Sequence, residues 1–220
     1  MVDQESKWIL NFHGIGRIER AFDPGEESVW ISKDRFREIL DAIAGDPTFQ
    51  ITFDDGNLSD FEIAVPELVE RGLTATFFLP AGKIGAPGFL GVKEIELIAG
   101  AGMSLGSHGW SHRSWRHLDP GTGRQEFTES KRLLEEITRT PIDVAACPFG
   151  DYDRSVIQSL RKAGYRLAYS SDRGWSRGRH FLEPRNTVHH DSDASSVILE
   201  RKMSKESTVK AMKQAVKRWR

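Results

Sequence analysis

The sequence predicts an α/β fold in which helices cover a sheet of parallel strands. Short apolar runs rich in β-branched and aromatic residues alternate with longer segments whose apolar residues recur every three or four positions. Two of the helical segments end at a glycine, in Glu-Arg-Gly at 70–72 and in Lys-Ala-Gly at 162–164. Strand alternating with helix is typical of a parallel sheet that is either open or closed into a barrel.

The predicted strands follow one another along most of the chain. Each is a short apolar run, as in Trp-Ile-Leu-Asn-Phe and Phe-Gln-Ile-Thr-Phe. We expect strands at 8–12, 49–53, 74–79, 103–106, 143–147 and 166–170, with a weaker pattern at 186–190.

The predicted helices lie between these strands. Their apolar residues share one helix face, with Phe36, Ile39, Leu40 and Ile43 in an early helix and Val156, Ile157 and Leu160 in a later one. No long linker rich in proline, glycine or serine divides the chain, so residues 1–220 are expected to form a single domain. The basic amphipathic stretch at about 204–219 is expected to pack as a last helix, with a partner or an anionic surface as the alternative.

Composition narrows the class of protein. The chain has 220 residues, of which 38% are hydrophobic, enough to bury the core of one medium domain. Its 31 basic and 32 acidic residues nearly cancel, which argues against nucleic acid as a partner. The single cysteine, Cys147, cannot form an internal disulfide. Because the sequence shows neither a signal-peptide pattern nor a bilayer-spanning apolar run, we expect a cytoplasmic protein with no transmembrane segment.

Polar residues follow the ends of the predicted strands. They are His13 after 8–12, Asp54 and Asp55 after 49–53, His108 and His112 after 103–106, Cys-Pro-Phe-Gly-Asp-Tyr-Asp at 147–153 and Ser-Asp-Arg-Gly-Trp at 171–175. The carboxyl ends of parallel strands meet on one rim of such a fold, and binding sites are built there. We therefore expect these polar groups to converge.

Two histidines and a nearby carboxylate have the composition of a metal site. His108 and His112 are four residues apart, so on a helical turn their rings would project from one face. A carboxylate from the Asp54–Asp55 pair would complete a set of two histidines and one aspartate, with positions left open for water and substrate. The alternatives are that the histidines lie on a surface loop and that Asp-Asp-Gly forms a plain turn.

Taken together, the motifs resemble a known family. Thr-Phe-Asp-Asp-Gly at 52–56, Ser-His-Gly-Trp-Ser-His at 107–112 and Cys-Pro-Phe-Gly-Asp-Tyr-Asp at 147–153 resemble those of the polysaccharide deacetylases with a NodB-homology domain, carbohydrate esterase family four. The segment at 72–82 is similar to the third strand of that family, and the resemblance runs from about Trp8 to about Val188. It implies a deformed (β/α) barrel, often of seven parallel strands, that uses a divalent metal to remove N-acetyl groups from an amino sugar or polysaccharide.

The resemblance also implies roles for individual residues. Asp55, His108 and His112 would bind the metal, and Asp54 would be the general base that takes a proton from water. Zinc is the expected metal, with cobalt, nickel or manganese as alternatives. The products would be acetate and a free amine.

Five further residues are implied in substrate binding: Pro148, Phe149, Gly150, Asp172 and Trp175. A backbone N–H of Phe149 or Gly150 would meet the negative charge that grows on the carbonyl oxygen. Trp175 could stack on a sugar ring, whereas its alternative role is packing in the core. For residues 148–150 the alternative is a plain loop turn.

The sequence departs from the family pattern at two places. The family commonly has an arginine two residues before the proline, where it orients the base, but this chain has Ala146 there and no arginine stands in for it locally. The histidine that usually protonates the leaving amine is matched loosely by His190, and His13 at the end of the first strand is a rival. His13 and His190 are therefore the two candidates for the catalytic acid, and the alternative for each is a structural or solvent-exposed histidine.

Three functions follow from these observations. The first is a metal-dependent N-deacetylase acting on an N-acetylated carbohydrate. The second is a hydrolase of a non-sugar amide or cyclic imide on the same scaffold, which the absence of a secretion signal favours. The third is a catalytically impaired carbohydrate-binding module, which the alanine at position 146 favours. The sequence does not indicate an oligomeric state.

Overall fold

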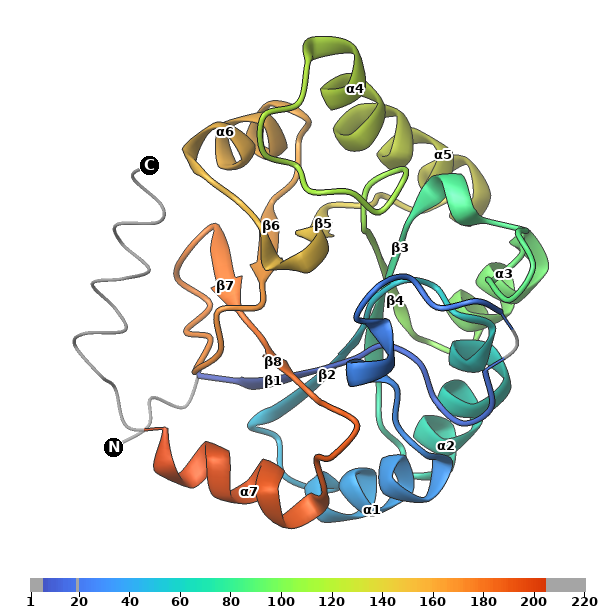
Figure 1. The fold of residues 1–220 in the computed structure, drawn as a ribbon, viewed down its shortest axis with the longest axis vertical. Helices are drawn as coiled ribbons and strands as arrows, with labels where there is room; N and C mark the ends of the chain where they lie inside the picture. Colours follow the sequence, from blue (N-terminus) through green and yellow to red (C-terminus); the bar gives the residue numbers. More distant parts are fainter. Residues whose placement is uncertain (1–5, 19, 205–220) are drawn as a thin grey trace.

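The computed structural model describes residues 6–18 and 20–204 of the chain. Within these residues, one sheet of parallel strands curves into a nearly closed barrel with helices around its outside (Figure 1). The strands are β1 (Trp8–Phe12), β2 (Phe49–Phe53), β3 (Ala75–Leu79), β4 (Ser104–Ser107), β5 (Val144–Ala146), β6 (Leu167–Ser170), β7 (Leu182–Pro184) and β8 (Asn186–Thr187). Their order in the sheet is β7-β6-β5-β4-β3-β2-β1-β8. This is the α/β barrel that the resemblance predicted.

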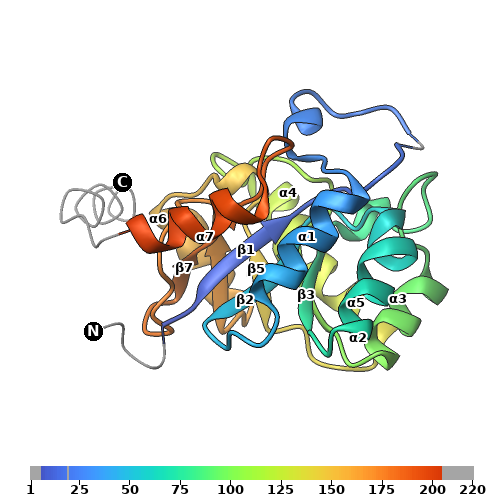
Figure 2. The same ribbon diagram turned by 90° about the horizontal axis from the view of Figure 1, so that it is seen from below.

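Helices connect the strands and cover the sheet. They are α1 (Lys33–Ile43), α2 (Val65–Glu70), α3 (Val92–Gly100), α4 (Pro120–Arg124), α5 (Ser130–Thr138), α6 (Arg154–Lys162) and α7 (Ala194–Met203). The side chains of Ser32, Asp153 and Asp193 cap the first turns of α1, α6 and α7 by accepting a backbone N–H three residues further on. Figure 2 shows α1 and α7 side by side on the outside of the sheet. None of the helices in the described ranges has the length and apolar composition needed to cross a membrane.

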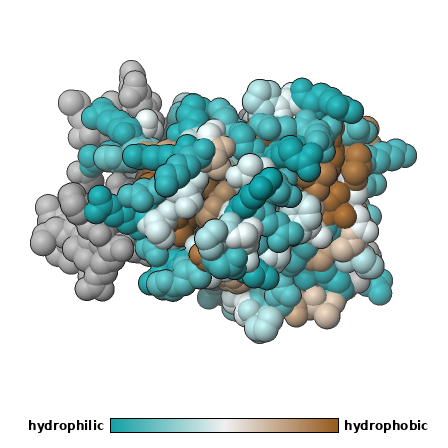
Figure 3. All heavy atoms as spheres, turned by 90° about the horizontal axis from the view of Figure 1, so that it is seen from above, coloured by the Kyte–Doolittle hydropathy of each residue, from teal (hydrophilic) through white to brown (hydrophobic). Residues whose placement is uncertain are grey.

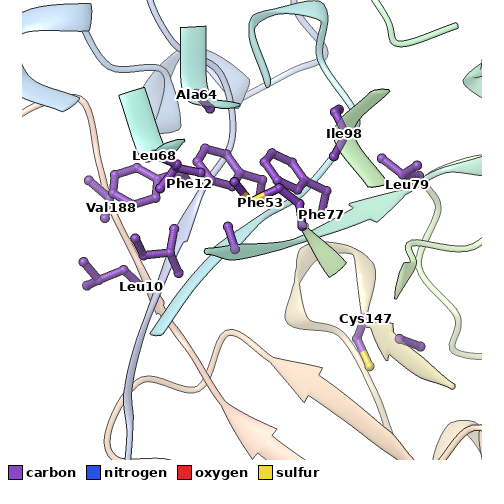
Figure 4. Close-up of a cluster of buried hydrophobic side chains, with 14 of the residues drawn as sticks. Leu10, Phe12, Phe53, Ala64, Leu68, Phe77, Leu79, Ile98, Cys147 and Val188 are labelled. Carbon is purple, nitrogen blue, oxygen red and sulfur yellow. The ribbon is translucent and has the colours of Figure 1, made fainter. Parts of the chain in front are cut away.

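The outer face of the sheet packs on the helices through a row of phenylalanines. Phe12, Phe53 and Phe77 are paired in register on neighbouring strands, and successive ring centroids are 5.4 Å and 4.6 Å apart. Leu68 of α2 and Ile98 of α3 belong to the same buried cluster (Figure 4). This packing holds the ends of β1 and β2 in place, and the loops with the polar motifs start there.

The inner face of the barrel is partly polar. Side chains alternate across a strand, so Asn11 and Thr52 point away from the phenylalanine row and into the barrel. Both residues are completely buried. The inner face also carries a small apolar cluster made of Ile9, Phe78, Ala146 and Tyr169.

The predicted strands can be compared with the observed ones directly. Strands β1 to β6 begin and end within one residue of their predicted bounds, whereas the predicted strand at 186–190 is present only as the two residues of β8. The additional strand β7 corrects the expected count of seven to eight. It escapes prediction because it has three residues, among them Glu183 and Pro184. Proline is tolerated there because β7 pairs on one side only, with β6.

A single residue, Arg185, joins β7 to β8 and thereby connects the two ends of the sheet. Its backbone N–H donates to the carbonyl of Ser170 at the end of β6 (3.0 Å), and the next residue, Asn186, pairs with Leu10 of β1. The two edges of the nearly closed barrel are therefore joined through Arg185. Of the helix predicted at about 204–219, only Ser204 is described, where it ends α7, and residues 205–219 lie outside the described residues.

The face of the molecule in Figure 3 is mostly hydrophilic, with hydrophobic side chains gathered toward the right of the view. The large hydrophobic side chains that are exposed in the described part of the chain are Ile18, Val69, Val92, Leu97, Phe149, Leu199 and Met203. Phe149 lies in the turn that follows β5, on the rim where the polar motifs converge.

Candidate active site

The candidate site lies at the carboxyl ends of the strands, as the sequence predicted. The Asp54 N–H donates to the carbonyl of Phe12 (3.0 Å), and the His108 N–H donates to the carbonyl of Leu79 (2.9 Å). These bonds continue the ladder of the sheet by one residue beyond the strands. The loops with the aspartates and the histidines therefore begin at rigid positions.

Asp55, His108 and His112 come together on this rim. Oδ1 of Asp55 lies 3.5 Å from Nε2 of His108 and 3.1 Å from Nε2 of His112. One ligand atom from each residue lies within 4.8 Å of the others, so the three could hold a single ion. Oδ1 of Asp55 is buried and accepts no hydrogen bond from the described residues. A buried carboxylate oxygen without a donor fits a cation at this position.

The orientation of His108 is fixed by a backbone carbonyl. Its Nδ1 lies 2.8 Å from the carbonyl oxygen of Ala146. Because a carbonyl can only accept, Nδ1 carries the proton and Nε2 presents its lone pair toward Asp55. Burial lowers the pKa of His108 to about 4, although the Asp54 carboxylate opposes this shift. The ring is therefore neutral at neutral pH, as a metal ligand must be.

The second histidine reaches the site from a loop and not from a helical turn. Residues 108–115 contain no helix, which corrects the geometry expected from the four-residue spacing. His112 itself has a left-handed backbone (φ 52°), and so has Gly109 (φ 78°). A Cβ at Gly109 would lie 2.4 Å from Oε2 of Glu126, so only glycine fits there.

Glu126 holds this histidine loop in shape. It is completely buried and lies in the π-helical turn Gln125–Glu129 between α4 and α5. Its carboxylate accepts the backbone N–H of Trp110 (2.7 Å) and of Ser111 (3.2 Å), and also the Ser111 hydroxyl. Bonds from backbone donors to a buried carboxylate are strong, so Glu126 determines where His112 is placed.

Asp54 points into the barrel, where it forms an ion pair with Arg185. Nη1 and Nη2 of Arg185 lie 2.7 Å from Oδ1 and Oδ2 of Asp54, and Nδ2 of Asn11 donates to Oδ2 (2.9 Å). Burial is the largest single influence and would raise the pKa of Asp54, but the charge and hydrogen bonds of Arg185, together with the charges of His108 and His13, lower the pKa to about 2. Oδ2 of Asp54 also lies 3.9 Å from Nε2 of His108. Asp54 is therefore an ionised carboxylate beside the candidate metal group.

The two adjacent aspartates face different partners because the backbone turns sharply between them. Asp55 (φ 78°) and Gly56 (φ 65°) are both left-handed. Burial would raise the pKa of Asp55, but His112, His13 and His108 lower it below its ordinary value. Each carboxylate thus has its own cationic or polar neighbours, so the two negative charges can lie next to each other in the sequence.

The two candidate acids occupy different environments. His13 is half-buried on the rim, and its Nδ1 is buried without a hydrogen-bond partner among the described residues. The His13 ring is close enough to Asp54 and Asp55 that its charge helps to lower the pKa of both carboxyl groups, against the effect of burial. His190 is exposed, and its ring contacts the carbonyl of Ser28 (3.3 Å). The structure brings His13 to the site, whereas His190 contacts a surface turn.

The turn at Pro148–Gly150 lies beside His112. Phe149 has a left-handed backbone (φ 57°), is 66% exposed, and its ring centroid lies 4.7 Å from that of His112. The Gly150 N–H donates to the carbonyl of Cys147 (2.9 Å), so it is engaged within the turn. Of the two N–H groups expected to meet a substrate oxygen, that of Gly150 therefore already has a partner. The Phe149 N–H has no hydrogen-bond partner in the described part of the chain.

Asp172 and Trp175 separate in the structure. Oδ2 of Asp172 accepts the Ser170 hydroxyl (2.9 Å) and the Tyr152 hydroxyl (2.5 Å), so this carboxylate stays near the rim, after β6. Trp175 packs edge-on against Trp8, with ring centroids 5.4 Å apart. Trp8 begins β1, so Trp175 lies at the end of the strand opposite to the rim. This position favours the alternative role of Trp175 in packing over a place in the site.

Several residues that support Asp54 or the histidine loop were not predicted from the sequence. They are Asn11, Thr52, Glu126 and Arg185. The first two could have been found, because a polar residue at an inward position of an apolar strand breaks the expected pattern. Nothing near Arg185 in the sequence indicates its contact with Asp54, which lies 131 positions away.

Comparisons with known proteins agree with these observations. Residues 42–168 match the family model described as polysaccharide deacetylase. The chain is 28% identical over 124 residues (56% of its length and 44% of the relative) to YxkH of Bacillus subtilis, which is provisionally named a polysaccharide deacetylase. It is 26% identical over 129 residues (59% of its length and 43% of the relative) to a chitin deacetylase of a Pestalotiopsis species. The chain thus matches less than half the length of these curated relatives.

A solved structure has the same fold. The Streptococcus pyogenes deacetylase PplD, in complex with acetate, superposes with a TM-score of 0.78 at 18% sequence identity. The superposition covers 91% of this chain and 99% of PplD. The barrel described above is therefore the fold of that protein.

Proposed function

Because the chain belongs to the polysaccharide deacetylase family, we propose that it is a metal-dependent hydrolase that removes N-acetyl groups from an amino sugar or polysaccharide. Water would cleave the amide C–N bond and leave acetate and a free amine. The observation that carries this proposal is the convergence of Asp55, His108 and His112 around a buried oxygen that accepts no hydrogen bond. Nitrogen and carboxylate donors suit zinc, and also cobalt, nickel or manganese.

Asp55, His108 and His112 would hold the ion, which when bound supplies a Lewis acid that polarises the amide carbonyl and makes water more acidic. The chain's own residues supply the remaining chemistry. Asp54 is ionised and is the group that accepts the proton of the attacking water. A carboxylate with a pKa of about 2 is a weak base, so it depends on water that has been made acidic.

The negative charge on the amide oxygen needs a donor, and the leaving nitrogen needs a proton. We assign the first role to the backbone N–H of Phe149, because the neighbouring Gly150 N–H is engaged within the turn. We assign the second to His13, because it lies near both aspartates and its Nδ1 is unpaired. The exposed ring of Phe149 beside His112 offers an apolar surface to the sugar.

Metal analysis combined with acetate release tests this function. Purified protein would be analysed for bound zinc, cobalt, nickel and manganese, and then incubated with N-acetylglucosamine oligomers with and without a chelator. We expect bound metal and chelator-sensitive acetate release. Bound metal without acetate from any sugar would favour the non-sugar amide hydrolase, and absence of both would favour the carbohydrate-binding module.

A further inference from the structure

Arg185 is a buried cation in the interior of the barrel. Its side chain has no exposed surface, and both terminal nitrogens donate to Asp54. Nη1 also donates to Oδ1 of Asn11 (2.8 Å) and approaches the Thr52 hydroxyl (3.3 Å). A planar guanidinium with this many partners has one orientation, so it holds the carboxylate in one orientation as well.

The backbone of Arg185 is fixed on both sides. Its N–H donates to Ser170, and its carbonyl accepts the N–H of Arg173 (3.1 Å). The next side chain, Asn186, donates to the carbonyl of Ile9 (3.1 Å) and accepts the N–H of Gly174 (2.7 Å). The arginine therefore extends from a rigid part of the barrel, the point at which it closes.

The Arg185 guanidinium and Ala146 share two aromatic neighbours, Phe78 and Tyr169. The Arg185 guanidinium carbon is 5.1 Å from the ring centroid of Phe78 and 5.8 Å from that of Tyr169. Ala146 belongs to the same buried cluster as these two rings, pairs with Tyr169 across the sheet and has no exposed surface. A long side chain at position 146 would compete for this volume. The small side chain of Ala146 thus leaves room in the barrel for the long side chain of Arg185.

We propose that Arg185 is the positioning residue of Asp54 and takes the role of the arginine that the family pattern places at position 146. This inference rests on the proposed function, because it concerns how the general base is held. A carboxylate offers about four lone-pair sites. Arg185 and Asn11 fill three of them, so the Asp54 carboxylate is held with about one site left to accept the proton of water.

Arg185→Lys tests the proposal with the charge retained. Lysine keeps the cation but loses the two-pronged contact, so the base is neutralised without being oriented. We expect kcat for acetate release to fall on the order of 10²-fold, as for other misplaced catalytic groups. The KM of the variant should stay within about twofold of the wild-type value. Its zinc affinity, measured by titration of the metal-free protein, should also stay within about twofold, which is well under the tenfold change that corresponds to about 1.4 kcal/mol. Arg166→Lys is the matched control, because Arg166 pairs with Asp143 on the surface (2.8 Å).

A second variant separates positioning from folding. Arg185→Met combined with Ala146→Arg moves the guanidinium to the family position, and we expect it to recover at least tenfold in kcat over Arg185→Met alone, which corresponds to about 1.4 kcal/mol. A folded Arg185→Lys protein with wild-type kcat would overturn the inference while the proposed function stands. A wild-type protein that binds zinc but releases no acetate would overturn both.

Discussion

The Nδ1 atom of His108 lies 2.8 Å from the carbonyl oxygen of Ala146, so the backbone of β5 decides which ring nitrogen faces Asp55. A ring held in this way presents a neutral nitrogen to an ion without needing to reorient. Removing the His108 ring should therefore weaken metal binding more than it changes any other property of the protein.

His108→Ala is expected to lower zinc affinity by more than ~100-fold. Removing a residue that only supports a metal ligand costs up to about 100-fold, and removing the ligand itself should cost more. The affinity would be measured by competition with a chelating dye. His190→Ala is the control, because His190 is exposed and contacts a surface turn. Equal affinity in the two variants would contradict the assignment of His108.

Asp54→Asn should keep the metal and lose turnover. An amide cannot accept a proton from water, and we expect kcat to fall by ~10² to 10⁴-fold. The variant also leaves the buried Arg185 without its counter-charge, so the free energy of unfolding should fall by about 3 kcal/mol. Steady-state kinetics and urea unfolding give the two values, and wild-type turnover would show that Asp54 is not the base.

Glu126→Gln tests the support of the histidine loop. The amide group of glutamine brings two donors to a site where backbone N–H groups of Trp110 and Ser111 already point at the carboxylate. We expect zinc affinity to fall by ~10 to 100-fold although Glu126 does not face the ion. Glu129→Gln, in the same helical turn but paired with Arg124 on the surface (3.2 Å), should bind zinc as the wild type does.

Phe149→Ala and Trp175→Ala should separate substrate contact from packing. Phe149 is 66% exposed, so its loss should raise KM for sugar oligomers several-fold and leave the melting temperature nearly unchanged. Trp175 packs on Trp8, and its loss should lower the free energy of unfolding by about 3 kcal/mol with KM unchanged. The reverse pattern would mean that Trp175, and not Phe149, contacts the substrate.

Tyr165 should make the fold sensitive to alkali. Burial raises the pKa of its hydroxyl to about 12, and the hydroxyl donates to the carbonyl of Phe127 (3.0 Å). In the unfolded chain the group has its ordinary pKa near 10. The neutral phenol thus contributes ~3 kcal/mol that is fully present below about pH 10 and lost as the pH rises to about 12. Urea unfolding at about pH 9 and about pH 11.5 should show a smaller alkaline decline for Tyr165→Phe than for the wild type.

The strands and the candidate metal group could be predicted because their signals are local. Each motif directly follows an apolar strand, and the carboxyl ends of parallel strands meet on one rim. Asp55, His108 and His112 therefore converge even though the loop of His112 is not helical. The orientation of that loop depends on Glu126, which has the sequence context of an ordinary solvated helix residue.

The support of the base could not be predicted. Arg185 and Asp54 are 131 positions apart, and the strand that leads to Arg185 has three residues and no apolar alternation. The region that matches the family model ends at residue 168, before Arg185 is reached. A buried ion pair of this kind is determined by closure of the barrel, which is a property of the complete sheet.

Closure at Arg185 also sets an order of events during synthesis. The three side chains that converge on the rim leave the ribosome well before residue 185, and so does the carboxylate that the guanidinium neutralises. A nascent or truncated chain that stops short of β7 contains the three candidate ligands but lacks the partner of its base. The proposed base would therefore gain its counter-charge only when the final strands are made.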